Sequence, residues 1–281
     1  MPEHRPYARD RNAPPSVTQV VGALDKPGLS WGAARETAAY AVHHMAAWSD
    51  LPSDRAISTL YRHHRGVWDH RALIGSAIHE VNAQWCQGRA VRVLDIIADI
   101  RERSTLWQQV PEQELYGELL PMTDGLSRFW MDAKPVPLSW EQVVRYRPGN
   151  PDLDYIGTLD WRAEINGQPL ILDLKTTGSV KHGQGKYWDQ WRLQLAAYRY
   201  ATEAVIYRDR KEVGTFELPE VAGAAVVHVY RDGKVEFNPV KAGPREHEIF
   251  LSLRRVYGWR QGEGQGMGNV DMTPALKGGA A

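Results

Sequence analysis

Cysteine is almost absent from this chain of 281 residues, which contains only Cys86. A single thiol cannot build a disulfide framework, a four-cysteine zinc ribbon or a four-cysteine iron–sulfur cluster within the chain. Net charge is absent as well, because 34 Lys and Arg residues balance 34 Asp and Glu residues. No overall basic field attracts nucleic acid, so any such binding must use a local patch.

Long apolar runs and several well-known catalytic motifs are also missing. No stretch of about 20 apolar residues occurs, and the opening MPEHRPYARDRNAPP lacks the hydrophobic core of a signal peptide. We therefore expect a cytoplasmic protein that does not enter a membrane. The patterns G-x-x-x-x-G-K-[ST] and G-x-S-x-G are absent, which argues against a fused ATP-driven helicase and a serine hydrolase.

The rest of the composition is typical of a globular domain, with 43% hydrophobic and 24% charged residues. Apolar residues recur at helical spacing up to about Met131, and strand-like patterns begin near Pro137. The Gly-rich C-terminal segment has little to bury. We predict a flexible arm at 1–14, one domain at 15–260 made of a helical cap (15–133) and an α/β core (134–260), and a disordered tail at 261–281.

The same patterns predict the individual elements. In the cap we expect helices at 30–48, 52–64, 71–87, 91–104 and 111–131. In the core we expect strands at 138–146, 154–165 and 169–176, a helix at 187–205, a hairpin of strands at 221–230 and 234–238, and a last helix at 246–259.

Two apolar, strand-like runs in the core each carry one acid, Asp160 and Asp173, and Lys175 follows the second acid. Because side chains alternate along a strand, Asp173 and Lys175 point to the same face. A turn at Asn166-Gly167 folds the second run back on the first, which brings Asp160 toward Asp173. Two carboxylates and an ammonium are costly to desolvate together unless a divalent cation compensates them. Oxygen ligands favour Mg²⁺ or Mn²⁺.

Four short motifs surround these residues in the order G-x-x-x-H, G-x-x-D, D-x-K-T and Q-x-x-x-Y. They are GSAIH at 75–79, GTLD at 157–160, DLKTT at 173–177 and QLAAY at 194–198. The set resembles the RecB-type branch of the PD-(D/E)XK nuclease superfamily. With the opening Pro15-Ser16-Val17-Thr18, it is similar to stand-alone phage exonucleases. Leu159 stands where the superfamily pattern has proline. Two other D-x-K triplets, at 132–134 and 232–234, lack a strand-borne acid before them.

The resemblance implies an α/β fold of the restriction-endonuclease type, with a mixed sheet flanked by helices and an N-terminal helical cap. It implies a Mg²⁺- or Mn²⁺-dependent exonuclease that hydrolyses DNA from its ends in recombination or repair, in a viral setting and in the host cytoplasm. The implied partners are DNA and a single-strand annealing or recombination protein, and an oligomer is compatible with it. Two alternatives stay open: a structure-specific DNA endonuclease, and a non-catalytic nucleic-acid-binding module on the same fold.

The resemblance also assigns roles at the centre of the site. Asp160 and Asp173 would bind the metal, with the backbone carbonyl of Leu174 nearby. Lys175 would position or help to deprotonate the attacking water and stabilise negative charge in the transition state. His79 would be a further metal ligand, which favours tolerance of Mn²⁺. The alternative for His79 is an ordinary helix histidine with its hydrogen bonds satisfied.

Two groups of residues would contact the substrate. Gln194 and Tyr198 lie one helical turn apart, so they share a face that would look toward the scissile phosphate, and Gln190 extends the row. An amphipathic helix that only packs on the sheet is the alternative. Lys181 and Lys186, in a Gly-containing loop, would grip the phosphate backbone, or else belong to a mobile surface loop.

Three weaker expectations concern the surroundings. Glu141 lies on the strand before Asp160, where it would act near the metals or simply be solvated. The basic segment 55–71 would flank a DNA channel or form a solvated helix face. Trp31 or Trp188 would stack on a base near a strand end.

Overall fold

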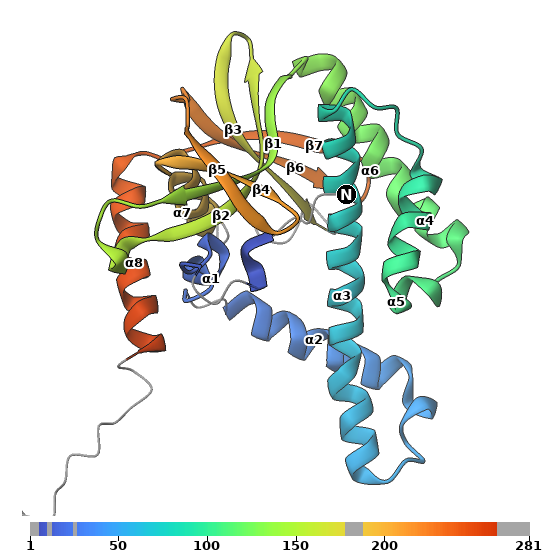
Figure 1. Cartoon of the computed structure of the whole chain (residues 1–281). Helices are drawn as coiled ribbons and strands as arrows, with labels where there is room; N and C mark the ends of the chain where they lie inside the picture. The colour runs from blue at the N-terminus through green and yellow to red at the C-terminus, as the bar shows by residue number, and fades with distance from the viewer. Residues whose placement is uncertain (1–5, 10–12, 25–26, 178–187, 263–281) are drawn as a thin grey trace, which may run out of the picture.

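The structure is a computed structural model, and it describes residues 6–9, 13–24, 27–177 and 188–262 (Figure 1). A seven-stranded sheet with the order β5-β4-β1-β2-β3-β6-β7 forms its centre. Only the β3–β6 pair is parallel, and the other neighbours are antiparallel. The expected α/β architecture, a mixed sheet flanked by helices, is therefore confirmed. Within the described ranges, no helix combines the length and apolarity needed to cross a bilayer.

The strands are β1 (Val136–Tyr146), β2 (Tyr155–Ile165), β3 (Gln168–Thr177), β4 (Glu203–Arg208), β5 (Lys211–Glu217), β6 (Gly223–Tyr230) and β7 (Val235–Val240). The α-helices are α1 (Val17–Val21), α2 (Pro27–His43), α3 (Ser53–Cys86), α4 (Val93–Arg103), α5 (Thr105–Gln108), α6 (Glu112–Ala133), α7 (Trp188–Arg199) and α8 (Pro244–Gln261). Short 3-10 turns at Pro6–Arg9, Met45–Ala47 and Pro151–Leu153 complete the chain.

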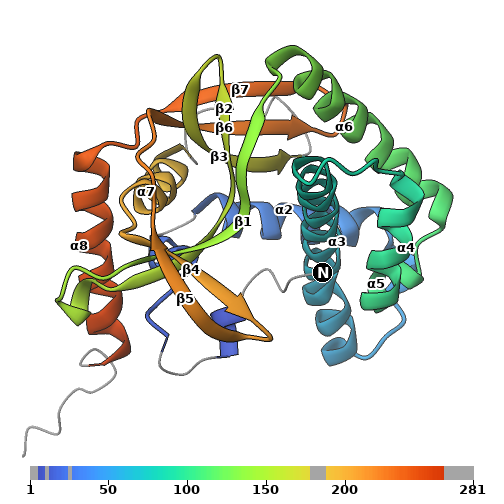
Figure 2. The same ribbon diagram turned by 45° about the horizontal axis from the view of Figure 1, so that its top comes forward.

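Helices cover both faces of the sheet, and Figure 2 shows α7 and α8 on one side and α3 to α6 on the other. The larger core cluster joins α3, α4 and α6 to one face, through residues such as Ile78, Ile97, Leu119, Trp161 and Leu174. The second cluster joins α1, α7 and α8 to the opposite face, through residues such as Val17, Tyr155, Ile171, Leu195 and Phe250. The sheet is thus buried on both faces, which explains the continuous apolar runs of its central strands.

The central hairpin forms as the sequence predicts. Asn166 and Gly167, with φ of 52° and 74°, make the two-residue turn between β2 and β3. Both residues adopt the left-handed conformation that a tight hairpin turn requires, and Asn and Gly tolerate it best. The chain then returns through α7 and the β4–β5 hairpin to β6, which lies parallel to β3.

Two predicted element boundaries are wrong. The helices expected at 52–64 and 71–87 are one continuous helix, α3, because residues 65–70 include no proline and the single Gly66 does not break the helix. The helix expected at 187–205 ends at Arg199, and residue 203 begins the β4–β5 hairpin, which the sequence does not predict. Asp209 and Arg210 make its turn with φ of 50° and 64°, without the glycine that marks the Asn166-Gly167 turn.

A buried arginine holds this unexpected hairpin against the sheet. Arg145 on β1 donates to Glu203 on β4 (Nε–Oε1 2.6 Å) and makes a two-pronged contact with Glu212 on β5 (2.7 and 3.0 Å). These hydrogen bonds raise the pKa of Arg145 further, although burial opposes the charge. Because β4 pairs with β1 over only two residues, these ion pairs add to a short backbone ladder.

The N-terminal segment also joins the α7 face. Ser16 caps α1, since its hydroxyl accepts a hydrogen bond from the backbone N–H of Gln19 at 3.2 Å. The Ile156 N–H donates to the carbonyl of Pro15 at 3.1 Å, so this segment lies against the start of β2. Val17 is fully buried there. The beginning of the expected cap therefore packs on the opposite face of the sheet from α3 to α6.

Candidate functional site

The candidate site lies where β2 and β3 separate. The two strands pair from Ile165–Gln168 as far as Trp161–Leu172, and both continue beyond that point without pairing with each other. Asp160 and Asp173 are the first residues past the last pair. The carboxylate of Asp160 accepts a hydrogen bond from the Leu174 N–H at 2.7 Å. The Asp160 side chain thus satisfies the Leu174 N–H, which has no β2 carbonyl to pair with once the two strands have separated.

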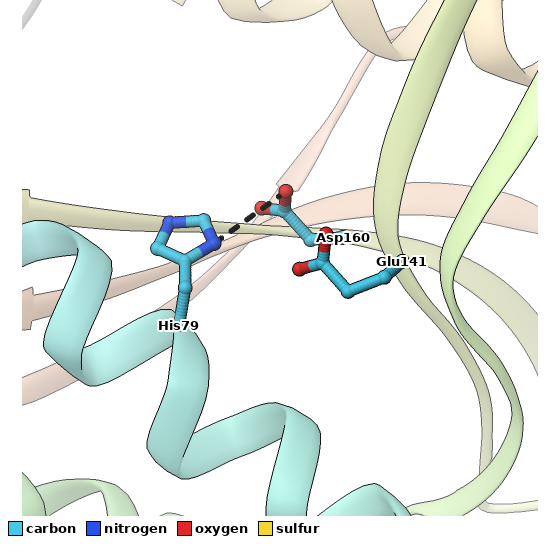
Figure 3. Close-up of side chains that lie close together, drawn as sticks. All are labelled: His79, Glu141 and Asp160. Atoms are coloured by element: carbon cyan, nitrogen blue, oxygen red, sulfur yellow. Dashed lines mark ion pairs between the residues drawn. The ribbon is translucent and has the colours of Figure 1, made fainter. Parts of the chain in front are cut away.

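Three side chains from three elements meet on one side of this fork. His79 of α3, Glu141 of β1 and Asp160 of β2 each offer a ligand atom, and these atoms all lie within 4.8 Å of one another. Figure 3 shows the His79 ring directed at the Asp160 carboxylate, and their Nδ1 and Oδ1 atoms are 3.6 Å apart. All three residues are half-buried. One imidazole and two carboxylates form a donor set that could hold a metal ion.

An unusual backbone conformation brings Glu141 to this position. Its φ is 45°, in the left-handed region that a glutamate inside a strand rarely adopts. The regular alternation of β2 is also interrupted nearby, because Leu159 packs in the cluster on the α7 side and Trp161 in the cluster on the α3 side. Strained backbone of this kind is concentrated at functional sites, where the surrounding structure enforces it.

Asp173 lies on the other side of the fork, where it contacts Lys175 and α7. The Lys175 Nζ is 2.5 Å from Asp173 Oδ2, which confirms that the two side chains share a face. Gln194 donates to Asp173 Oδ1 at 3.0 Å and to the Tyr198 hydroxyl at 3.3 Å. Gln194 and Tyr198 therefore look into the site from α7, as their spacing predicts. The cluster of His79, Glu141 and Asp160 does not include Asp173, whose carboxylate contacts Lys175 and Gln194.

Burial and charge set the protonation of this pair. Burial raises the pKa of Asp173 to about 6, although the Lys175 ammonium opposes the rise and the Asp160 carboxylate adds to it. Burial lowers the pKa of Lys175, but the charges of Asp173 and Asp160 outweigh that effect, so the pKa is raised overall. Lys175 therefore stays an ammonium at neutral pH, held beside a carboxylate that burial makes easier to protonate.

The glycines of the motifs have a packing reason. A Cβ on Gly75 would approach the Thr176 Oγ1 to 3.0 Å, so the glycine lets α3 lie close to the end of β3. A Cβ on Gly157 would lie 2.6 Å from the Tyr198 ring and 3.0 Å from Val17. Side chains at these positions would push α3, α7 or α1 away from the sheet.

Other expected site residues are placed less centrally or fall outside the description. Gln190 is half-buried at the start of α7, and Leu174 is fully buried, with its N–H bound to Asp160. Lys181 and Lys186 lie outside the described residues, as does the side chain of Trp188. Trp31 is exposed on α2.

Sequence reasoning missed one neighbour of the site, His228 on β6. It pairs in register with Lys175, and its Nε2 lies 3.0 Å from the Thr177 hydroxyl. Burial lowers the pKa of His228, and the nearby Glu236 partly opposes this. The parallel register between β3 and β6 brings His228 here, and no local sequence signal reports that register.

The chain was compared with known proteins. No family model matches it, and neither does any curated protein. Among solved structures, one entitled "Crystal structure of SSO0001" is 12% identical, with a TM-score of 0.31, over 68% of this chain and 85% of that chain. A similarity this low carries no argument about fold or function.

The packing of Gly157 yields a prediction about the site. Gly157→Ala should destabilise the protein by about 1–3 kcal/mol, because the new methyl group must displace Tyr198 or Val17. Urea denaturation measures the change. The control is Gly214→Ala on β5, where no atom lies within 4 Å of the added Cβ, and its stability should change little. Equal stability of both variants would show that Tyr198 is not held tightly against β2.

Proposed function

We propose that this protein is a metal-dependent deoxyribonuclease of the PD-(D/E)XK type, acting as an exonuclease on DNA ends. The observation that carries the proposal is the convergence at the β2–β3 fork. Residues from four separate sequence motifs meet there, because His79 pairs with Asp160 and Asp173 contacts both Lys175 and Gln194. If the charged residues had met by chance, the motif glycines Gly75 and Gly157 would have no reason to pack against β3 and α7, which carry the site residues.

The donor set fits a divalent cation. His79, Glu141 and Asp160 would hold it, and the neighbouring Asp173 is a buried carboxylate whose ionised form a cation would favour. Such a cation would supply charge neutralisation at the scissile phosphate and lower the pKa of a bound water. The histidine in the set favours Mn²⁺ alongside Mg²⁺.

The chain's own residues would complete the chemistry. The Lys175 ammonium would donate a hydrogen bond to the attacking water and stabilise the negative charge that develops on the phosphate. Asp173 keeps this ammonium charged and oriented. Gln194 fixes Asp173 in turn, and its bond to Tyr198 fixes Gln194. Each group is thus oriented by the next one outward from the fork.

The first prediction concerns the metal ligands. Removing His79, Glu141 or Asp160 (His79→Ala, Glu141→Gln, Asp160→Asn) should weaken Mn²⁺ binding by roughly tenfold or more, because each offers one of the clustered ligand atoms. Isothermal titration calorimetry of the metal-free protein measures the affinity. Glu164→Gln, an exposed acid on the same strand as Asp160, is the control and should bind like wild type. Unchanged affinity in all three variants would remove the metal site.

The second prediction separates catalysis from binding. Lys175→Ala should lower cleavage by about 10²–10³-fold, the usual loss when a group that stabilises transition-state charge is removed. Affinity for DNA and Mn²⁺ should change little, because the lysine acts mainly on the transition state. Lys234→Ala, in the Asp232-Gly233-Lys234 turn, is the matched control and should cleave normally. Equal losses in binding and rate would make Lys175 a phosphate anchor instead.

The third prediction concerns DNA ends. With Mg²⁺ or Mn²⁺, linear DNA should be degraded progressively from its termini while covalently closed circles persist, and EDTA should stop the reaction. Because the net charge is zero, phosphate binding is local and activity should fall as salt rises. Gel analysis of end-labelled linear and closed circular DNA checks both points. Rapid linearisation of circles would favour the endonuclease, and binding without degradation would favour the non-catalytic module.

A further inference from the structure

Part of the helical layer contributes little to the core: between residues 30 and 73, Leu73 alone packs against a buried cluster. We call residues 30–73, which comprise most of α2 and the first half of α3, the α2–α3 arm. None of its side chains is buried, and the buried residues of α3 begin at Ile74. Figure 1 shows α3 continuing past the sheet, with the end of α2 beside it. The α2–α3 arm therefore buries little apolar surface, and its exposed faces are available to contact other molecules.

One face of α3 extends from the arm toward the candidate site, and α2 crosses beside it at Trp68. Tyr61 precedes His79 by about five helical turns, so both side chains leave the helix in the same direction, roughly 27 Å apart. Arg65, Trp68 and Ser76 fall close to the same line. Tyr61, Arg65 and Ser76 are exposed, and Trp68 is half-buried. We call this face, from Tyr61 to Ser76, the α3 track.

The far end of the track carries an ordered aromatic ring. The Arg65 guanidinium lies 5.4 Å from the centre of the Tyr61 ring, and its Nη2 is 3.4 Å from the Tyr61 hydroxyl. Tyr61 is nevertheless 57% exposed. An aromatic ring held in place by arginine can stack on a base, while the guanidinium remains near enough to pair with a phosphate.

A second aromatic group borders the middle of the track. α2 crosses α3 at Trp68, where a Cβ on Gly32 would lie 3.9 Å from the Trp68 ring. The adjacent Trp31 is 78% exposed, which is rare for a residue with so large an apolar surface. Trp31 thus directly precedes the residue at which α2 meets the track.

The charge of this segment suits a phosphate backbone. Between Asp54 and Asp69, α3 carries Arg55, Arg62 and Arg65 and no acidic side chain. Basic residues interleaved with exposed aromatic rings are the pattern of sites that bind single strands without reading their sequence. The arm also exposes the apolar side chains of Val42, Met45 and Ile57, so a protein partner is the competing occupant that the test below must exclude.

We propose that the α3 track binds a single nucleic-acid strand that extends from the candidate site, with one base stacked on Tyr61 and a phosphate paired with Arg65. This inference rests on the proposed function for the identity of the site. It adds a contact about 27 Å from His79, a distance that corresponds to roughly eight stacked nucleotides.

Strand length provides the test. Affinities of fluorescent oligothymidylates of four and twenty nucleotides are measured by anisotropy in EDTA, which prevents metal-dependent cleavage. Tyr61→Ala should weaken binding of the long strand by roughly 5- to 100-fold, the effect of losing one stacked base. Binding of the short strand, which cannot span the track from the site, should not change. Tyr61→Trp should restore affinity, and Arg65→Ala should reduce the salt dependence for the long strand.

Trp259→Ala is the matched control, because Trp259 on α8 is 58% exposed and lies off the arm. It should leave both affinities unchanged, and thermal denaturation should show that Tyr61→Ala folds as stably as wild type. The inference is overturned by equal losses for both lengths, by no loss, or by absence of long-strand binding in wild type. A changed oligomeric state in light scattering, without lost affinity, would assign Tyr61 to an interface with a second copy.

The two proposals can fail separately. If wild type binds the long strand through Tyr61 but never cleaves DNA with Mg²⁺ or Mn²⁺, the nuclease assignment is wrong and the track stands. If wild type degrades DNA and Tyr61→Ala binds the long strand normally, the track is wrong and the nuclease assignment stands.

Discussion

The hydrogen bond between the Leu174 N–H and the Asp160 carboxylate is the constraint on which the site depends. It lies just past the last β2–β3 pair, where an ordinary sheet would continue its backbone ladder. By accepting from β3, Asp160 terminates the pairing and keeps the two strands near each other. The opening that results leaves room for Asp173 and Lys175 on β3, while the far side of β2 still faces His79 and Glu141.

Several features of this fork lower the stability of the folded protein, and packing in the rest of the fold offsets them. Asp173 is buried and ionises reluctantly, and Glu141 has a backbone conformation that its side chain disfavours. Both clusters of apolar side chains surround the fork and hold the strands in place. The motif glycines then allow α3 and α7 to approach the sheet closely enough to deliver His79, Gln194 and Tyr198. A well-packed scaffold around a poorly stabilised centre is what polar chemistry in a protein interior requires.

The sequence predicts the parts of the site that depend on local spacing. Alternation along β3 places Asp173 with Lys175, and the one-turn spacing of Gln194 and Tyr198 places both on the same side of α7. The position of Glu141 depends on its positive φ, which cannot be predicted from the residue type. His228 depends on the register between two strands that are distant in the sequence. The sequence predicts no β4–β5 hairpin, because Asp209-Arg210 lacks the glycine that marks the Asn166-Gly167 turn.

The continuity of α3 has a mechanical consequence. A single helix of 34 residues joins the exposed arm to His79 without a break, so the arm and His79 would move together as one rigid helix rather than as two hinged segments. The close contact at Gly75 and Thr176 lies next to the His79 end and would serve as the fulcrum. A small tilt of the outer end would then move the imidazole relative to the two carboxylates. By thermodynamic reciprocity, a ligand that favours one tilt changes metal affinity by the same factor as the metal changes affinity for that ligand.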